Sequence, residues 1–320
     1  MAQHFLLSAA ARTLSLRKIY RDGEEAAYEA FCKMRWEETD GEPVCPRCGS
    51  WEAYSIATRR KFKCKGCHHQ FSVTSGTIFA SRKMAFVDLL AAICITVNAS
   101  KGLSMLQLSR DLDCQYKTAF VLAHKLREAM ALEVQTGEVL GGHVEVDGAY
   151  FGGHIRPENR KEDRKDRRLK QHQTGKRRVV VAFRERYGRT LPLVTMSEAE
   201  GVELATVHVD RMATMSADEA SHWDMLHGAW NVDRVNHSVV YSDHGKHTNM
   251  VESFFSRLRR MVRGQHHHVS PKYLHQYANQ AAWLEDNRRK DNGSLAYGLV
   301  QNAMGSPVSR NWKGYWQRAA

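Results

Sequence analysis

The chain has 320 residues, and its 47 lysines and arginines exceed its 35 acidic residues by 12. The resulting pI near 9.4 favours a polyanionic partner, either nucleic acid or an anionic membrane surface. The longest apolar run, residues 84–97, contains Asp88 and is too short to cross a bilayer, so we expect no membrane-spanning helix. We also predict no signal peptide, because the apolar N-terminal patch lacks a clear cleavage site.

Cysteine spacing gives the first specific signal. Of the seven cysteines, four form two Cys-x-x-Cys units separated by fifteen residues: Cys45, Cys48, Cys64 and Cys67. This spacing predicts a four-thiolate structural zinc site in a reducing compartment, hence the cytoplasm, rather than a disulfide framework. His68 and His69 are alternative ligands that the paired cysteines make unnecessary. The basic residues between the two units suit either DNA contact or a solvated rim.

Helical periodicity dominates residues 14–38 and 86–132. In the second region a short helix begins at Ser104 as N-cap, and a longer one runs from Gln115 to about Met130. This is the pattern of a helix-turn-helix, whose second helix enters the major groove of DNA. Its N-terminal end carries the candidates for base contact: Gln115, Tyr116, Lys117 and Thr118. Helix pairs are common, so the DNA interpretation depends on the adjacent ribbon and the positive charge.

A glycine-rich boundary at residues 136–142 precedes a predicted strand over 143–151. Glu145 and Asp147 alternate with apolar residues along this strand. An acid near the end of a core strand costs free energy unless it is paired, so a metal at Asp147 is the economical explanation, with an ordinary strand-end aspartate as the alternative. The insert at residues 155–176 is highly charged and predicts a loop near phosphates.

The following segments predict alternating strands and helices. They are a hairpin over 177–184 and 189–196, a helix over 202–211, a strand over 213–218, a helix over 219–227, a strand from Val235 to Tyr241, an amphipathic helix to Arg263 and a closing helix over 273–289. This order, with an acid on the first strand, favours a ribonuclease-H-like domain. The helix that ends at Arg263 carries Glu252, which is either an ion-pairing residue or a third metal ligand. The C-terminal thirty residues remain unassigned.

Three segments together resemble a known family. They are VCPRCGS…KFKCKGCHHQFSVTSGTIF, VEVDGAYFGG and HTNMVESFFSRLRRMVRGQHHHVSPKYLHQYANQAAWLEDNRR. In this order they resemble the zinc ribbon, the first acidic strand and the end of the catalytic domain of insertion-sequence transposases of the IS1595 type, also called ISXO2-like. The resemblance extends from about residue 45 to 289, and three motifs in the right order make it specific.

The resemblance implies a triad of acidic residues that lie far apart in the sequence. Asp147 matches the first member. The second is an aspartate at a strand end shortly before an aromatic residue, which fits Asp218 ahead of Trp223. Asp210 and Asp224 compete for this role, although Asp210 falls within a predicted helix and Asp224 follows the aromatic residue.

The third member stays open, because the family pattern allows Glu, Asn or His there: we favour Glu252, seven residues before Arg259, and Asn249, one turn earlier on the same helix face, is the alternative. The family usually has lysine where this chain has Arg259. A guanidinium keeps the charge and can contact phosphate through two nitrogens. Arg260 and Arg263 extend this basic face as candidate DNA contacts.

The implied chemistry uses two Mg²⁺ ions, for which Mn²⁺ can substitute, bridged by Asp147 and held by Asp218 and Glu252. One ion activates water and then the freed 3′-hydroxyl, while the other stabilises the leaving oxygen. His247 and His237 are candidates for orienting phosphate or transferring protons, or are ordinary polar neighbours.

We therefore predict a multidomain α+β protein. Its segments are an N-terminal helical part (1–42), a zinc ribbon (43–80), a helix-turn-helix (81–135), a ribonuclease-H-like α/β catalytic domain with a mixed sheet (140–290) and a C-terminal tail (291–320). The predicted function is a bacterial, nucleoid-associated DNA transposase that acts as a homo-oligomer on double-stranded transposon ends and target DNA. A DNA-binding regulator with an inactive catalytic domain and a ribonuclease-H-like repair or resolvase nuclease are the alternatives.

Overall fold

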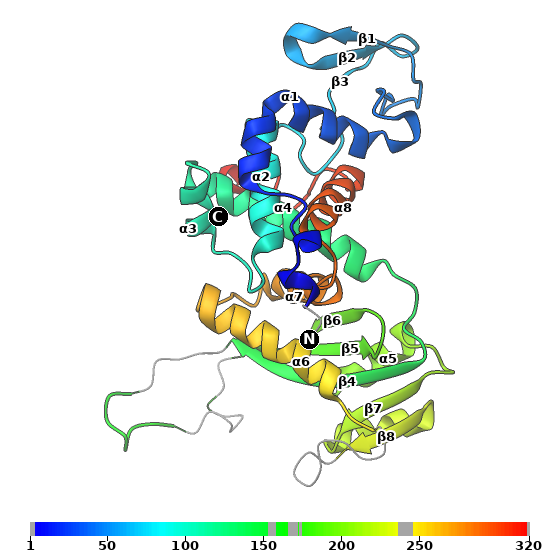
Figure 1. Ribbon diagram of the computed structural model, residues 1–320. Coiled ribbons are helices and arrows are strands. Elements are labelled where there is room, and N and C mark those ends of the chain that lie inside the picture. Colours follow the sequence, from blue (N-terminus) through cyan, green and yellow to red (C-terminus); the bar gives the residue numbers. More distant parts are fainter. Residues whose placement is uncertain (1–3, 153–157, 166–171, 173–174, 236–245, 319–320) are drawn as a thin grey trace. The chain divides into compact units, whose positions relative to one another are not determined.

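The computed structural model describes residues 4–152, 158–165, 172, 175–235 and 246–318 (Figure 1). The chain divides into two compact units: unit 1 comprises residues 1–133 and 287–320, and unit 2 comprises residues 134–286. The C-terminal residues, which the sequence left unassigned, thus belong with the N-terminal part. No helix in the described ranges is both long and apolar enough to span a membrane.

Unit 1 is mainly helical. Its helices are α1 (Leu16–Arg35), α2 (Phe86–Asn98), α3 (Met105–Asp111), α4 (Tyr116–Gln135, which ends in unit 2) and α8 (Asn292–Gly305). The hydroxyl of Ser15 caps α1 by accepting the Lys18 N–H, and Gly23 kinks the helix with φ of 80°. Helix α8 packs against α1 and α2, so the C-terminal segment completes the core of this unit.

The zinc-ribbon region forms a small antiparallel sheet in the order β1-β2-β3. Its strands are β1 (Ala53–Ile56), β2 (Lys61–Cys64) and β3 (Gln70–Phe71). The Trp36 ring lies edge-on to Phe62 and Phe71, with centroids 5.6 and 6.3 Å away. These aromatic contacts give the ribbon an apolar base that its short strands alone would lack.

Helices α3 and α4 are the helix pair predicted from the sequence. The Ser104 hydroxyl accepts the Gln107 N–H at 3.1 Å, which confirms Ser104 as the N-cap of α3. Asp113 adopts a left-handed φ of 46° in the connecting turn. Helix α4 continues five residues beyond the expected end at Met130, to Gln135.

Unit 2 contains a five-stranded mixed sheet in the order β6-β5-β4-β7-β8. Its strands are β4 (His143–Gly152), β5 (Arg177–Glu185), β6 (Thr190–Thr195), β7 (Thr214–Asp218) and β8 (Asn231–Val235). Strands β4, β5 and β6 are antiparallel neighbours, whereas β4, β7 and β8 run parallel. The predicted hairpin and mixed sheet are confirmed.

Some predicted elements differ from the structure. The predicted helix over 219–227 is the 3₁₀ helix η6 (Ser221–Gly228). The last described strand, β8, ends at Val235, where the sequence placed the start of a strand; residues 236–241 of that prediction lie outside the described residues. Alternation alone did not locate β8, because only Val232 and Val235 in it are buried.

Helices cover both faces of the sheet (Figure 1). On one face, α5 (Glu200–His208) and η6 pack on a core that includes Val144, Val146, Phe183 and Trp223. On the other face lie α6 (Asn249–Arg260), which contacts β4 and β5, and α7 (Leu274–Asp286), which contacts β6. Beyond Arg260 the chain continues as a π-helical segment, η7 (Met261–His266). Helix α6 therefore covers the face on which Glu145 and Asp147 lie.

Candidate metal centres

The four predicted zinc ligands lie together in unit 1. The ligand atoms of Cys45, Cys48, Cys64 and Cys67 are all within 4.8 Å of one another. The sulfur atoms of Cys45 and Cys67 are 3.6 Å apart, and those of Cys48 and Cys64 are 3.5 Å apart. Four sulfurs at Zn–S distances of about 2.3 Å stand about 3.8 Å apart in a tetrahedron, so the cluster fits one Zn²⁺ ion.

A backbone group favours the thiolate form of Cys64. The pKa of Cys48 is raised instead, because the opposing backbone hydrogen bond from Ser50 is outweighed by hydrogen bonds from the neighbouring sulfurs and by burial. The Cys67 N–H donates to the Cys64 sulfur at 3.5 Å, and this bond is the largest contribution that lowers the pKa of Cys64 to about 6. A thiol must lose its proton to bind metal, so a depressed pKa favours occupancy at neutral pH. All four positions of the tetrahedron are protein sulfur, which leaves no open position for a substrate.

In unit 2, the register of the sheet brings Asp147 and Asp218 together. Pairing of β4 with β7 ends at Val146 and Ala217, and each aspartate is the next residue of its strand. Because the two strands are parallel, both carboxylates lie at the edge where this pairing stops, although β4 itself continues to Gly152 beside β5. The Asp147 Oδ1 accepts the Gly148 N–H at 2.7 Å, and the Asp218 Oδ1 accepts the Ala220 N–H at 3.1 Å.

A third acid at this edge was missed by the sequence analysis. Glu198 lies between β6 and α5, and its Oε2 is 3.6 Å from the His222 Nε2. A Cβ atom added to Gly148 would lie 2.4 Å from the Glu198 Cγ, so glycine is required there for Glu198 to approach β4. Glu200 and Glu203 are close by in the sequence, so no local pattern distinguished Glu198 from its neighbours.

The electrostatics of this edge favour a cation. Burial raises the pKa of Asp147 to about 7; the Gly148 N–H opposes this, and the charges of Asp218 and Glu198 add to it. Burial and the Asp218 charge also raise the pKa of Glu198. Arg259 lowers the pKa of Asp147, so its guanidinium acts on the same carboxylate. Neighbouring carboxylates repel one another, which disfavours their ionised forms. A bound metal ion stabilises the ionised forms, because its positive charge offsets this repulsion.

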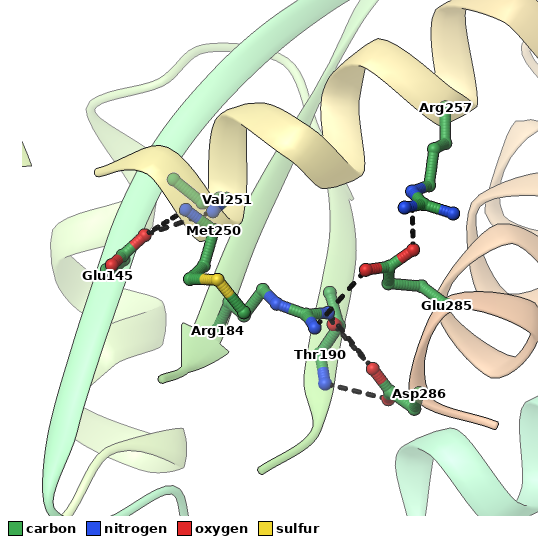
Figure 2. A network of polar contacts seen from close by, with 8 residues as sticks. All are labelled: Glu145, Arg184, Thr190, Met250, Val251, Arg257, Glu285 and Asp286. Carbon is green, nitrogen blue, oxygen red and sulfur yellow. Dashed lines mark hydrogen bonds and ion pairs between the residues drawn. The ribbon is translucent and has the colours of Figure 1, made fainter. Parts of the chain in front are cut away.

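Helix α6 is fixed to strand β4 by Glu145, whose side chain is completely buried (Figure 2). Its Oε2 accepts the backbone N–H groups of Met250 and Val251 at 2.8 and 3.1 Å. Its Oε1 lies 3.2 Å from the Arg186 Nε and 3.0 Å from the His247 Nδ1. A carboxylate at a helix N-terminus satisfies free N–H groups and interacts favourably with the helix dipole.

A second polar network holds the other end of α6 (Figure 2). Arg257, in the last turn, contacts the buried Glu285 of α7 at 2.6 Å. Arg184 of β5 lies 3.4 Å from Glu285 and 3.1 Å from Asp286. Asp286 also accepts the Thr190 N–H at 2.8 Å. Helix α6 is therefore anchored to the sheet at its first turn and to α7 at its last.

The remaining triad candidates lie on α6. Glu252 is in the first turn, where its Oε1 accepts the Thr248 hydroxyl at 3.2 Å, and Asn249 is the exposed first residue. Among the residues that the structure describes, only the four cysteines form a group of three or more ligand side chains within 4.8 Å. The structure therefore brings Asp147 and Asp218 to one sheet edge but does not bring Glu252 with them to ligand distance.

The alternative candidates for the second acid, and the candidate histidine that the structure describes, lie elsewhere in unit 2 or are paired with another side chain. Asp210 donates its backbone N–H to Leu140, just before β4 begins, so it lies at the opposite end of the parallel strands from Asp218. Asp224 forms an ion pair with Arg234 at 2.8 Å. His247 contacts Glu145, which places it at the N-terminus of α6, and His237 lies outside the described residues.

The candidate DNA contacts are exposed. Gln115, Lys117 and Thr118 lie at the start of α4, and Arg260 and Arg263 follow the anchored part of α6. Arg60 of the ribbon is instead paired with Glu24 and Glu25, both at 2.7 Å. Half of the charged insert at 155–176 lies outside the described residues.

Two segments of the chain match models of one family. Residues 139–286 match the ISXO2-like transposase domain of IS1595, and residues 23–70 match the transposase zinc-ribbon domain of IS1595. These ranges include both candidate metal centres and together cover more than half of the chain. Searches of curated proteins and of solved structures found no match. The chain belongs to the IS1595 family of transposases, of the ISXO2-like type.

Proposed function

We propose that this protein cleaves DNA strands at transposon ends and joins them to target DNA. It would use metal ions at the sheet edge of unit 2 that carries Asp147, Asp218 and Glu198, which we call the acidic edge. The observation that carries the proposal is the position of Asp147 and Asp218 directly after the last paired residues of the adjacent parallel strands β4 and β7, with the Asp147 pKa raised to about 7. The sheet order and strand directions support the predicted ribonuclease-H-like assignment.

In this proposal Asp147, Asp218 and Glu252 hold two Mg²⁺ ions, with Asn249 as the competing third member. Carboxylate oxygens are the ligands that Mg²⁺ prefers, and Glu198 supplies a further carboxylate at the same edge. Bound Mg²⁺ would activate the attacking oxygen and stabilise the leaving oxygen.

The other residues position DNA in this proposal. Arg259 lies close enough to lower the pKa of Asp147, so it can also contact a phosphate at that carboxylate. Arg260 and Arg263 extend the cationic surface along the DNA. The α3–α4 pair acts as the helix-turn-helix, with Gln115, Lys117 and Thr118 at the groove, and the zinc ribbon supports binding.

The test is strand transfer by the purified full-length chain. The substrate carries the DNA that flanks the reading frame, supplied with a target plasmid and Mg²⁺ or Mn²⁺. We expect nicking at a defined end and covalent joining to the target, both abolished by EDTA. Binding of the flanking DNA without cleavage in either metal would contradict the proposal and favour a DNA-binding regulator.

A further inference from the structure

Unit 1 contains a cavity of about 540 Å³ that the proposed chemistry does not use. It is bounded by residues 79–84, by one side of α4 and by residues 308–317. Its volume falls in the range of about 300–1,000 Å³ that is usual for ligand sites. Among the residues that the structure describes, five cationic side chains and no acidic ones line it: Arg82, Lys83, Lys117, Lys125 and Lys313.

Lys125 is the cation that most needs an anion. Its side chain is half-buried, and this burial lowers its pKa. Within the part of the chain that the structure describes, it makes no hydrogen bond or ion pair; the charge of the nearby Glu128 opposes the shift of its pKa only in part, and Glu128 accepts the Ser309 hydroxyl at 2.7 Å. A partly desolvated ammonium without a close partner is costly, so an anionic ligand would stabilise it.

The cavity also offers an aromatic surface. Trp316 is 45% exposed, and its ring lies 5.3 Å from the Lys117 Nζ. Its indole N–H donates to the Lys117 carbonyl at 3.3 Å, which holds the C-terminal segment on α4. Phe120 supports this position with its ring centroid 5.5 Å from that of Trp316. An aromatic face beside several cations suits a ligand that has both a flat ring and phosphate.

We propose that this cavity binds single-stranded DNA, with one unpaired base stacked on Trp316 and its flanking phosphates at Lys117 and Lys125. The choice of DNA rests on the proposed function and on the adjacent start of α4. An unpaired base exposes its flat face, whereas a paired base is stacked within the duplex and cannot enter a cavity of this size. Strand cleavage at a transposon end leaves a terminal nucleotide that is continuous with its strand on one side only, so it unpairs more easily than an internal one, and the cavity would hold it in that state.

The experiment measures binding of the full-length chain to a fluorescein-labelled 15-nucleotide single strand and to its duplex, by fluorescence anisotropy. Trp316→Ala should weaken single-strand binding about tenfold, because base stacking on an aromatic side chain has about that effect. Lys125→Met should weaken it by a smaller factor, and duplex binding should change little in both variants. Trp316→Tyr should restore most of the affinity, since it retains an aromatic face.

Two control variants match these substitutions. Tyr187→Ala removes a fully exposed aromatic side chain from the β5–β6 turn, and Lys290→Met removes an exposed lysine of unit 1 outside the cavity. Equal losses in Trp316→Ala and Tyr187→Ala, or equal losses on single strand and duplex, would overturn the proposal. Displacement of the single strand by dAMP alone at matching affinity would also overturn it and assign the cavity to a free nucleotide. The binding assay requires no cleavage. A protein that is inactive in strand transfer can therefore still bind single-stranded DNA in this cavity, and the two proposals are tested separately.

Discussion

The two candidate metal centres differ in how far the protein assembles them. In unit 1 the ligand atoms of four cysteines lie within 4.8 Å of one another, although they come from two separate turns of the chain. In unit 2, Asp147 and Asp218 share a sheet edge, but no three of its described ligand side chains reach that distance. A closed thiolate cluster serves folding, whereas separated carboxylates on a rigid scaffold leave room for metal and a phosphate group.

The largest effect should follow from Asp147→Asn, which keeps the shape of the side chain and removes its charge. Strand cleavage should fall on the order of 10³-fold, because metal-assisted charge stabilisation contributes several kcal/mol. DNA binding should remain. Asp210→Asn is the matched control, because Asp210 lies at the other end of the parallel strands. Cleavage by Asp147→Asn at the unmodified rate would refute the assignment of the acidic edge.

Cys64→Ser tests whether the thiolate cluster is independent of catalysis. Zinc content measured by metal analysis should fall from about one ion per chain to near zero, since a structural site needs all four ligands. The ribbon should become sensitive to protease, while unit 2 keeps its fold. Cys114→Ser serves as the control, because Cys114 lies outside the cluster. Unchanged zinc content in Cys64→Ser would rule out this cluster as the zinc site.

Glu145→Gln should separate positioning from metal binding in unit 2. Removing the charge leaves the partly buried Arg186 and the N-terminus of α6 without their carboxylate, at a cost of about 3 kcal/mol. A displaced α6 should reduce cleavage on the order of 10²-fold. Glu203→Gln, on the exposed side of α5, is the control.

The readout for Glu145→Gln is urea denaturation together with the metal dependence of cleavage. A positioning role predicts a lower maximal rate with little change in the Mg²⁺ concentration that gives half of it. A large rise in that Mg²⁺ concentration would instead identify Glu145 as a metal ligand.

Gln115→Ala tests whether unit 1 recognises DNA sequence. Binding to the flanking DNA should weaken about tenfold, and binding to random DNA should change less, because base contacts specify whereas phosphate contacts position. Competition binding at fixed salt measures both. Lys290→Met again controls for a lost surface contact. Equal losses on the two DNAs would reduce α4 to a structural role.

The smallest expected effect is a pH dependence of the melting temperature of the metal-free protein, which arises from Asp147. The folded-state pKa of Asp147, about 7, lies above its ordinary value of 3.8, so the folded chain binds this proton more tightly than the unfolded chain. In EDTA, the melting temperature should therefore fall as pH rises from about 4 to about 7 through this group. Asp147→Asn should flatten that dependence, and saturating Mg²⁺ should raise the melting temperature at pH 8. An equally steep pH dependence in Asp147→Asn would contradict this origin.

Local patterns were sufficient for many elements. Ser104 was identified as an N-cap because a side-chain oxygen three residues before a free N–H forms a local bond. The hairpin β5-β6 and strand β4 followed from alternation, and the zinc ligands from the spacing of cysteines. The extent of α4 and the position of β8 were less accurate, because tertiary packing decides where an element ends.

The sequence by itself determined the residue types and spacings: two cysteine pairs, an acid on the first core strand, and a helix with Glu252 on its polar face. Only the tertiary structure decided that Glu145 caps a helix 105 residues away and that Glu198 approaches Gly148. It also placed residues 287–320 in unit 1, where Trp316 completes the cavity on α4. The physical reason is that periodicity and capping act over a few residues, whereas these contacts join distant segments that only packing brings together.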